Sequence, residues 1–314
     1  EQREYNPKLG ASSMDKSQIK ILHLFFLMVW LAGCAPVEPG LATTASPTRE
    51  LPTATPTLAA IPTRAETATP TQTDIVSAPA CSPASLESGS TGAGLLDKPM
   101  DYYAVLPPCY QQGEQKYPVL YLLHGLNANQ QQWLDLGIGQ KAAEMMLAGE
   151  IPPFLIVLPF DYSFKQPGEY RFEEVFLEHL IPEIETAYRV QTDRSARAVG
   201  GLSRGGAWAI YLVSRNPETF AIVGAHSPVV FPSTGGALTL LLRDMPLELR
   251  PTFYVDAGDR DIDFRGIQAF TNLLNSYDYP HEWRQNLGYH DEAYWKEQVE
   301  EYLRWYGRQF SGAE

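Results

Sequence analysis

Cysteine is scarce in this chain of 314 residues, in which only Cys34, Cys81 and Cys109 occur. No pair of them has the short spacing of a metal-binding motif, so we expect no metal site and no other cofactor. Basic residues are also few, because 24 Lys and Arg stand against 37 Asp and Glu, a formal net charge of −13. This charge argues against nucleic acid and anionic membrane surfaces as partners.

A long apolar run is missing as well, since the apolar stretch at 21–31 is too short to span a bilayer as a helix. Its context is that of a secretory signal, with basic Lys16 and Lys20 before it. It ends at 31–34 in Leu-Ala-Gly-Cys, which resembles a bacterial lipobox. We therefore expect translation to start at Met14 and Cys34 to be lipidated. An ordinary signal peptide with an accidental cysteine is the alternative.

Aromatic residues are absent from 35–80, a segment that holds eight prolines and eleven threonines. Such a composition cannot form a core and predicts an extended tether. The expected organisation is a signal peptide with upstream residues at 1–33, a lipidated cysteine with a disordered linker at 34–80, and a catalytic domain at 81–314. The protein would then be exported and held on the outer face of a bacterial membrane. There Cys81 and Cys109 could form a disulfide or remain free thiols.

From about residue 95 onward, strand-like and helix-like stretches alternate. Strands are predicted at 102–106, 119–123, 154–158, 196–200, 221–225, 252–256 and 281–287. Helices are predicted at 140–148, 172–188, 206–213, 265–277 and 292–310, the third stopping near Asn216-Pro217. This alternation predicts an α/β fold with a mostly parallel sheet and helices on both faces. The connection at 227–250 is too short for a large lid domain, which favours an open cleft.

The centre of this pattern is the Gly-x-Ser-x-Gly sequence at 201–205. An apolar strand precedes it and an apolar helix follows it, as in the turn that exposes a nucleophilic serine. The flanking glycines fit such a bend because a Cβ atom there would collide with the neighbouring strand and helix. We therefore predict Ser203 to be a nucleophile.

A nucleophilic serine needs a histidine base and an acid that orients the base. His290 lies between the last predicted strand and the last predicted helix, where α/β-hydrolases carry the base, and we prefer it to His226 and His281. The acid must come from the loop that opens at Gly258. We choose Asp261 and keep Asp259 as the alternative; a solvated loop or a helix cap would explain the remaining aspartates.

Acyl transfer also requires donors for the developing oxyanion. We predict these to be the backbone N–H groups of Arg204 and Leu126, and we expect His124 to be a structural loop residue. Aromatic side chains on loops at the same edge could stack on an aryl or sugar ring, or could only pack. They are Trp133, Phe160, Tyr162 and Tyr170.

The chain resembles the esterase D/feruloyl esterase family of α/β-hydrolases over about residues 98–310. The matching stretches are YPVLYLLHG at 117–125, LIPEIE at 180–185 with YRV at 188–190, AVGGLSRGG at 198–206, and GYH at 288–290 with Trp295. The family's acid position also looks like Gly258-x-x-Asp261. Members include feruloyl and acetylxylan esterases, S-formylglutathione hydrolases, siderophore esterases and mycolyltransferases.

The resemblance implies a serine ester hydrolase that works through an acyl-enzyme. Export disfavours formylglutathione hydrolysis, which is a cytoplasmic task, and favours feruloyl or acetyl esters of plant polysaccharides. Acyl transfer, hydrolysis of other small esters or siderophores, and a non-catalytic surface binding protein are the alternatives. An ester substrate is thus the expected partner, with contact to a membrane only through the lipid.

Overall fold

The computed structural model describes residues 81–163, 165–231 and 235–312. The expectations for residues 1–80, including the signal peptide, Cys34 and the linker, lie outside this part of the chain. A sheet of eight strands forms its centre. The strands are β1 (Ser85–Thr91), β2 (Met100–Leu106), β3 (Val119–Leu123), β4 (Leu155–Pro159), β5 (Arg197–Leu202), β6 (Ile222–His226), β7 (Thr252–Gly258) and β8 (His281–Asn286).

The strands lie in the order β1-β2-β4-β3-β5-β6-β7-β8. Strands β1 and β2 pair antiparallel, as do β2 and β4, whereas every pairing from β4 to β8 is parallel. The sheet is therefore mixed and mostly parallel, as the sequence predicts. Because the parallel strands run the same way, the loops at their carboxyl ends gather along one edge of the sheet.

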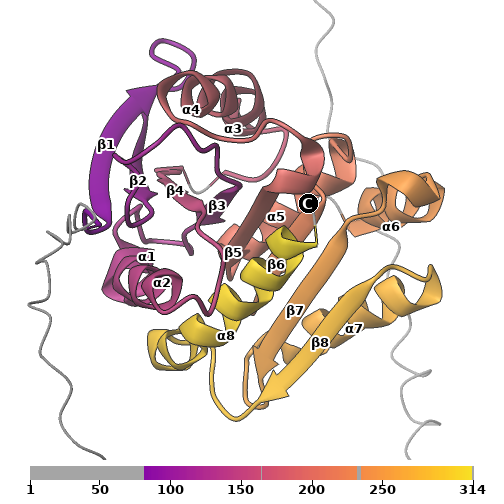
Figure 1. The fold of residues 1–314 in the computed structure, drawn as a ribbon. Helices are drawn as coiled ribbons and strands as arrows, with labels where there is room; N and C mark the ends of the chain where they lie inside the picture. The colour runs from indigo at the N-terminus through magenta and orange to yellow at the C-terminus, as the bar shows by residue number, and fades with distance from the viewer. Residues whose placement is uncertain (1–80, 164, 232–234, 313–314) are drawn as a thin grey trace, which may run out of the picture. The chain divides into compact units, whose positions relative to one another are not determined.

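Helices cover both faces of the sheet (Figure 1). One apolar layer combines the sheet with α3 (Phe172–Val175), α4 (Ile181–Ala187), α5 (Arg204–Arg215), α6 (Gly235–Asp244) and α7 (Phe264–Ser276). The other contains α1 (Gln132–Asp135), α2 (Ile138–Leu147) and α8 (Glu292–Ser311). Since side chains alternate along a strand, β3 feeds both layers, Tyr121 into the first and Leu120 into the second. The α/β fold predicted from the sequence is confirmed.

Four elements differ from the prediction. The helix predicted at 172–188 is interrupted by a π-helical turn, η2 (Phe176–Leu180). Pro182 in the next turn explains this, because proline lacks an N–H and crowds the carbonyl one turn earlier. Strand β1 and helices α1 and α6 were not predicted. Most of β1 is exposed, so it lacks the alternating apolar pattern of a half-buried strand.

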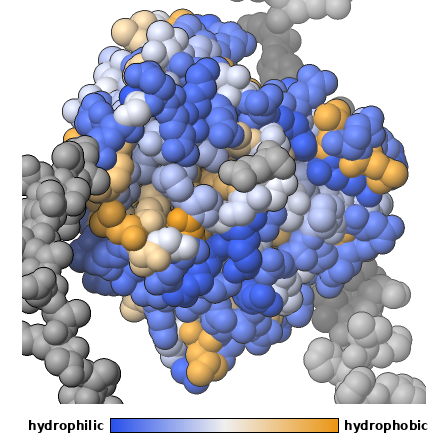
Figure 2. All heavy atoms as spheres, in the orientation of Figure 1, coloured by the Kyte–Doolittle hydropathy of each residue, from blue (hydrophilic) through white to orange (hydrophobic). Residues whose placement is uncertain are grey.

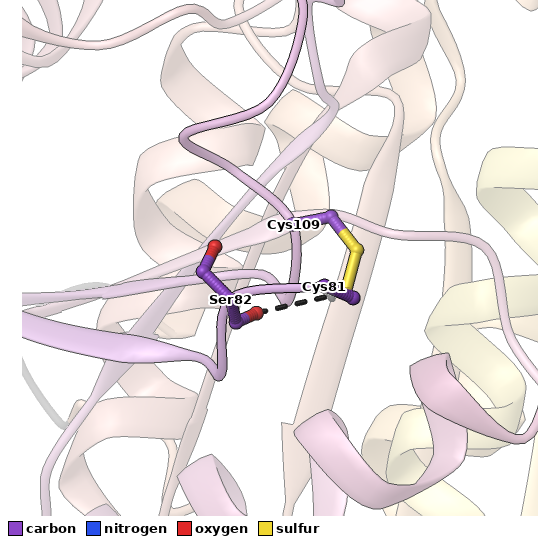
Figure 3. The surroundings of a disulfide bond; sticks show 3 residues. All are labelled: Cys81, Ser82 and Cys109. Carbon is purple, nitrogen blue, oxygen red and sulfur yellow. Dashed lines mark hydrogen bonds between the residues drawn. A yellow bond between two sulfur atoms is a disulfide. The ribbon is translucent and has the colours of Figure 1, made fainter. Parts of the chain in front are cut away.

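A disulfide joins Cys81 to Cys109, with the two Cα atoms 4.8 Å apart (Figure 3). Of the two alternatives left open by the sequence, a disulfide and two free thiols, the structure contains the disulfide. The Cys109 amide also donates a hydrogen bond of 2.9 Å to the Ser82 carbonyl. The crosslink closes a loop that contains β1 and β2, and it fixes the start of the exposed edge strand to the body of the domain.

The face of the molecule drawn in Figure 2 is mostly hydrophilic, with small apolar patches between polar side chains. Within residues 81–312, apart from the few undescribed positions, none of the helices combines the length and the apolar character that crossing a bilayer requires.

Candidate active site

Ser203 lies on the sharp turn between β5 and α5. Its φ of 54° and ψ of −117° are strained for a residue with a side chain. The turn is possible because its glycines lack a Cβ: at Gly205 this atom would lie 2.2 Å from the Leu123 carbonyl oxygen, and at Gly201 2.4 Å from the Gly205 backbone. The steric reason predicted for these glycines is confirmed. The Ser203 hydroxyl is thereby presented at the carboxyl edge of the sheet, at the N-terminus of α5.

The structure brings Ser203, His290 and Asp261 together in one hydrogen-bonded chain. His290 Nε2 lies 2.8 Å from Ser203 Oγ, and His290 Nδ1 lies 3.0 Å from both carboxylate oxygens of Asp261. Asp261 is buried, whereas the His290 side chain is 18% exposed and so remains open to substrate. The geometry lets His290 take a proton from the serine while Asp261 holds the ring.

The neighbouring aspartates have other roles. Asp259, the alternative acid, accepts a hydrogen bond of 3.0 Å from the Gly288 amide and so holds the loop that carries His290. The half-exposed Asp263 carboxylate lies 3.9 Å from His290 Nδ1. Asp261, Asp263 and His290 could also hold a cation. A cation would displace the Nδ1 proton that His290 shares with Asp261. We therefore infer that these carboxylates interact with the imidazole and do not bind a metal ion.

The pKa values of the pair follow from this contact. Burial alone would lower the pKa of His290, but the hydrogen bond and the charge of Asp261 outweigh it, and the pKa is raised above 6.5. Burial alone would raise the pKa of Asp261, but the hydrogen bonds from His290 and the Asp263 amide hold it below 3.8. At neutral pH Asp261 is therefore an anion poised to stabilise a protonated imidazole.

The two rival histidines lie away from the hydroxyl of Ser203. His226 is fully buried between Asp256 and Tyr306, with its ring nitrogens 2.9 Å and 3.1 Å from their oxygens. Its backbone carbonyl accepts a hydrogen bond of 2.8 Å from the Ser203 amide, so His226 stabilises the turn that carries the nucleophile. His281 begins β8, and its Nδ1 contacts the Tyr279 carbonyl at 2.8 Å.

The two predicted oxyanion donors flank the nucleophile. Arg204 follows Ser203 as the first residue of α5, so its N–H is not used within the helix. Gly125, which precedes Leu126, lies beside the serine, because a Cβ built on it would be 3.8 Å from Ser203 Cβ. No backbone acceptor among the described residues takes the N–H of Leu126 or Arg204. Both amides are thus available to a developing oxyanion.

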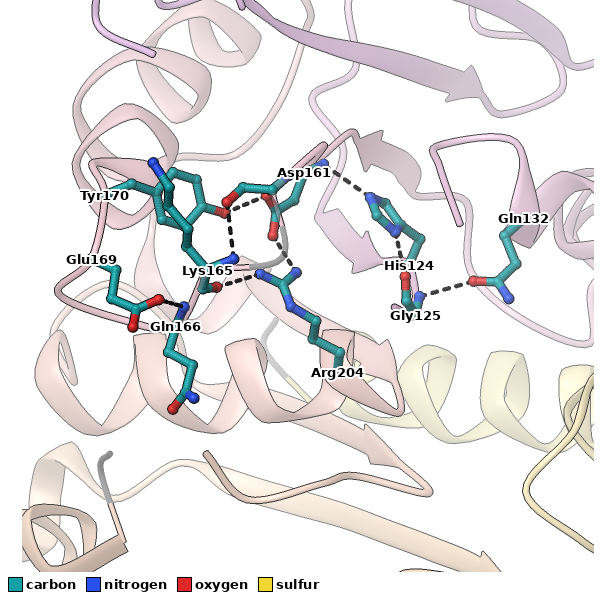
Figure 4. Close-up of polar contacts among 10 residues, drawn as sticks. His124, Gly125, Gln132, Asp161, Lys165, Gln166, Glu169, Tyr170 and Arg204 are labelled. Atoms are coloured by element: carbon teal, nitrogen blue, oxygen red, sulfur yellow. Dashed lines mark hydrogen bonds and ion pairs between the residues drawn. The ribbon is translucent and has the colours of Figure 1, made fainter. Parts of the chain in front are cut away.

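A polar network beside the nucleophile was not predicted. The Arg204 guanidinium forms a buried ion pair with Asp161 and donates to the Lys165 carbonyl at 2.7 Å (Figure 4). The Tyr170 hydroxyl donates to the same carboxylate of Asp161, and the Asp161 amide donates to His124 Nε2 at 2.9 Å. Asp161 and His124 each follow the carboxyl end of a parallel strand, and this position was the signal available in the sequence.

For one of the aromatic residues predicted to bind substrate, Trp133, the prediction is wrong. Its side chain is fully buried, and its indole N–H donates to the Leu123 carbonyl at 3.0 Å, so it belongs to the core. Phe160 and Tyr162 instead line a cavity of about 140 Å³ next to Leu126. The other lining residues are His124, Gly125, Asn127, Ala128, Asp161, Ser163 and Arg204. The cavity therefore opens beside both oxyanion donors.

Comparison with known proteins places this site in a family context. The family model described as "Putative esterase" matches residues 93–306. An "Endo-1,4-beta-xylanase/feruloyl esterase" of Xylanibacter ruminicola is 34% identical over 122 residues, 36% of this chain and 17% of that protein. An esterase of Mycobacterium tuberculosis is 32% identical over 133 residues, 39% of this chain and 28% of that protein. The chain thus spans less than a third of the length of these relatives.

Solved structures share the fold. A ferulic acid esterase with 25% identity superposes with a TM-score of 0.65, over 72% of this chain and 99% of that chain. A fluorophosphonate-binding serine hydrolase of Staphylococcus aureus, 18% identical, gives 0.61 over 71% of this chain and 98% of that chain. At this lower identity the likeness shows the fold alone.

Proposed function

Since this chain belongs to the putative esterase family of α/β-hydrolases and is a serine-type carboxylic ester hydrolase, we propose that it cleaves feruloyl or acetyl esters of plant polysaccharides. The hydrogen-bonded chain from Ser203 through His290 to Asp261 carries the proposal. The choice of substrate class is supported by one relative, which is named an endo-1,4-beta-xylanase/feruloyl esterase.

In the proposed mechanism His290 Nε2 accepts the Ser203 proton as Oγ attacks the ester carbonyl. Asp261 stabilises the imidazolium, and the amides of Leu126 and Arg204 stabilise the oxyanion. The imidazolium then protonates the departing alcohol, which leaves an acyl-enzyme on Ser203. Water, deprotonated by the same imidazole, attacks the acyl-enzyme, and the imidazolium returns that proton to Ser203 Oγ as the acid leaves. Each proton that His290 accepts is thus returned within the cycle.

The cavity beside the oxyanion donors supports an aromatic or sugar-bearing ester. Phe160 and Tyr162 form part of its wall, with ring centroids 6.2 Å apart in an edge-to-face arrangement. Such rings can contact a planar aryl group or the flat face of a sugar. Asp161, Ser163 and Asn127 add polar groups to the same wall. A mixed lining of this kind suits an ester with an apolar ring and hydroxyl groups.

We expect kcat/KM for methyl ferulate or for acetylated xylan to exceed that for short p-nitrophenyl esters. The reason is that contacts with a ring in the cavity stabilise the transition state beyond what the reacting atoms contribute. Initial rates on the three substrates, with Phe160→Ala as the variant, provide the measurement. Activity confined to the activated p-nitrophenyl esters would refute the polysaccharide assignment.

We also propose that Cys34 carries a lipid that holds the enzyme on the outer face of a bacterial membrane. The lipobox-like sequence and the tether composition of 35–80 support this. Expressed in a bacterium with labelled palmitate, the full chain should become labelled and sediment with membranes, whereas Cys34→Ala should do neither. Cys81 and Cys109 serve as internal controls, because their disulfide leaves no thiol to acylate. Equal labelling of Cys34→Ala would refute the anchor.

A further inference from the structure

His124 lies directly after β3, and its two ring nitrogens have different partners. Nδ1 is 2.7 Å from the Gly125 carbonyl oxygen, and Nε2 is 2.9 Å from the Asp161 amide nitrogen (Figure 4). A backbone N–H can only donate, so Nε2 accepts and the ring proton is on Nδ1, which donates to Gly125. Burial lowers the pKa of His124 and so favours the neutral ring that this arrangement needs.

The carbonyl that His124 holds belongs to the same peptide group as the Leu126 N–H. That group is planar and trans, since no cis peptide occurs among the described residues. Its C=O and N–H therefore point in opposite directions, and fixing the oxygen fixes the direction of the N–H. The amide on the other side of Gly125 is also held, because it donates to Gln132 Oε1 at 2.9 Å.

We propose that His124 is a positioning residue that aims the Leu126 amide at the oxyanion. Asp161 links this arrangement to the other donor: its amide fixes the His124 ring, and its carboxylate pairs with the side chain of Arg204. One residue of the loop after β4 thereby connects both halves of the oxyanion hole. This inference rests on the proposed nucleophile, Ser203, which is tested separately by its own substitution.

Two substitutions of His124 separate its two hydrogen bonds. The amide nitrogen of Asn can occupy the place of Nδ1 and still donate to Gly125, whereas the amide of Gln reaches only the place of Nε2. We expect His124→Asn to lower kcat the least of the three variants, because it keeps a donor to the Gly125 carbonyl and loses only the contact with the Asp161 amide. His124→Gln and His124→Ala should lower kcat by about 10- to 100-fold with little change in KM, because a misaimed donor weakens transition-state stabilisation selectively.

Inhibitor binding gives a second reading of the same variants. A phenylboronic acid forms a tetrahedral adduct on the serine and should lose affinity in parallel with kcat, while Tm identifies any variant that is merely unstable. Equal kcat for His124→Gln and His124→Asn would overturn the inference, as would a loss confined to KM. If Ser203→Ala is inactive in that case, the proposed function still stands.

A further test uses the wild-type protein and therefore does not depend on whether a variant folds. The ¹⁵N chemical shifts of the His124 ring distinguish a protonated nitrogen from an unprotonated one. At neutral pH we expect the proton on Nδ1 alone. A proton on Nε2 would overturn the inference, because Nδ1 could then not donate to the Gly125 carbonyl.

Discussion

Ser203→Ala is expected to lower kcat by about 10⁵- to 10⁶-fold, because no acyl-enzyme can form without the hydroxyl. The folded structure should survive, since alanine keeps the Cβ and loses the hydrogen bond between the hydroxyl and His290. Hydrolysis of an activated ester and labelling by a fluorophosphonate provide the measurements. Turnover at the wild-type rate in this variant would end the assignment of the nucleophile.

Ser203→Gly is the matched control for the backbone. It removes the same hydroxyl, so activity should fall equally, but glycine relieves the strain of a φ of 54°. The free energy of unfolding of the Gly variant should therefore exceed that of the Ala variant by about 1 kcal/mol or more. Denaturant unfolding of both proteins measures the difference, and an equal free energy of unfolding would show that the turn is not strained.

The second large effect is expected for Asp261→Asn, which should lower kcat by about 10⁴-fold. An Asn amide can donate to His290 Nδ1, which would place the ring proton on Nε2 and leave no acceptor for the Ser203 proton. The carboxylate that raises the pKa of His290 is also removed. In the wild type, kcat/KM should rise with pH through an apparent pKa above 6.5, because only neutral His290 is a base. In the variant this rise of kcat/KM should occur at lower pH.

Asp263→Asn removes the same charge two residues away. Its carboxylate lies near the ring, at 3.9 Å from Nδ1, but Nδ1 donates its hydrogen bond to the Asp261 carboxylate. We expect kcat within a few-fold of wild type. The apparent pKa of the rise in kcat/KM should fall only slightly, since Asp263 contributes less than Asp261 to the raised pKa of His290. A loss as large as that of Asp261→Asn would show that the acid had been assigned to the wrong residue.

The parts of the site that could be predicted are those that the local sequence specifies. The turn at Ser203 requires glycines for steric reasons, and the order of serine, acid and histidine follows the order of the strands. The sequence and the family resemblance favour Asp261 over Asp259, but the local sequence offers no physical reason for the choice. Both lie on the same loop, and only the fold shows which carboxylate faces His290 and which one accepts the Gly288 amide.

The remaining features depend on residues distant in the chain. His124 and Asp161 are 37 positions apart, and Asp161 and Arg204 are 43 apart, with no local pattern to connect them. Trp133 is among the aromatic residues expected either to stack on substrate or only to pack, because it falls on a loop at the predicted catalytic edge. Whether that edge is covered depends on α8, whose Tyr302 packs edge-to-face against the indole. Likewise β1 is a strand through its pairing with β2 rather than through its own apolar pattern.

The disulfide between Cys81 and Cys109 also determines how the domain would respond to mechanical force. A pull that arrives from residues ahead of Cys81 passes through the covalent bond directly to Cys109, and bypasses the intervening residues. Those residues include β1, whose ladder to β2 forms one edge of the sheet. With the bond intact, tension would load the chain beyond Cys109 first. With the bond reduced, the same tension would peel the edge strand away one hydrogen bond at a time.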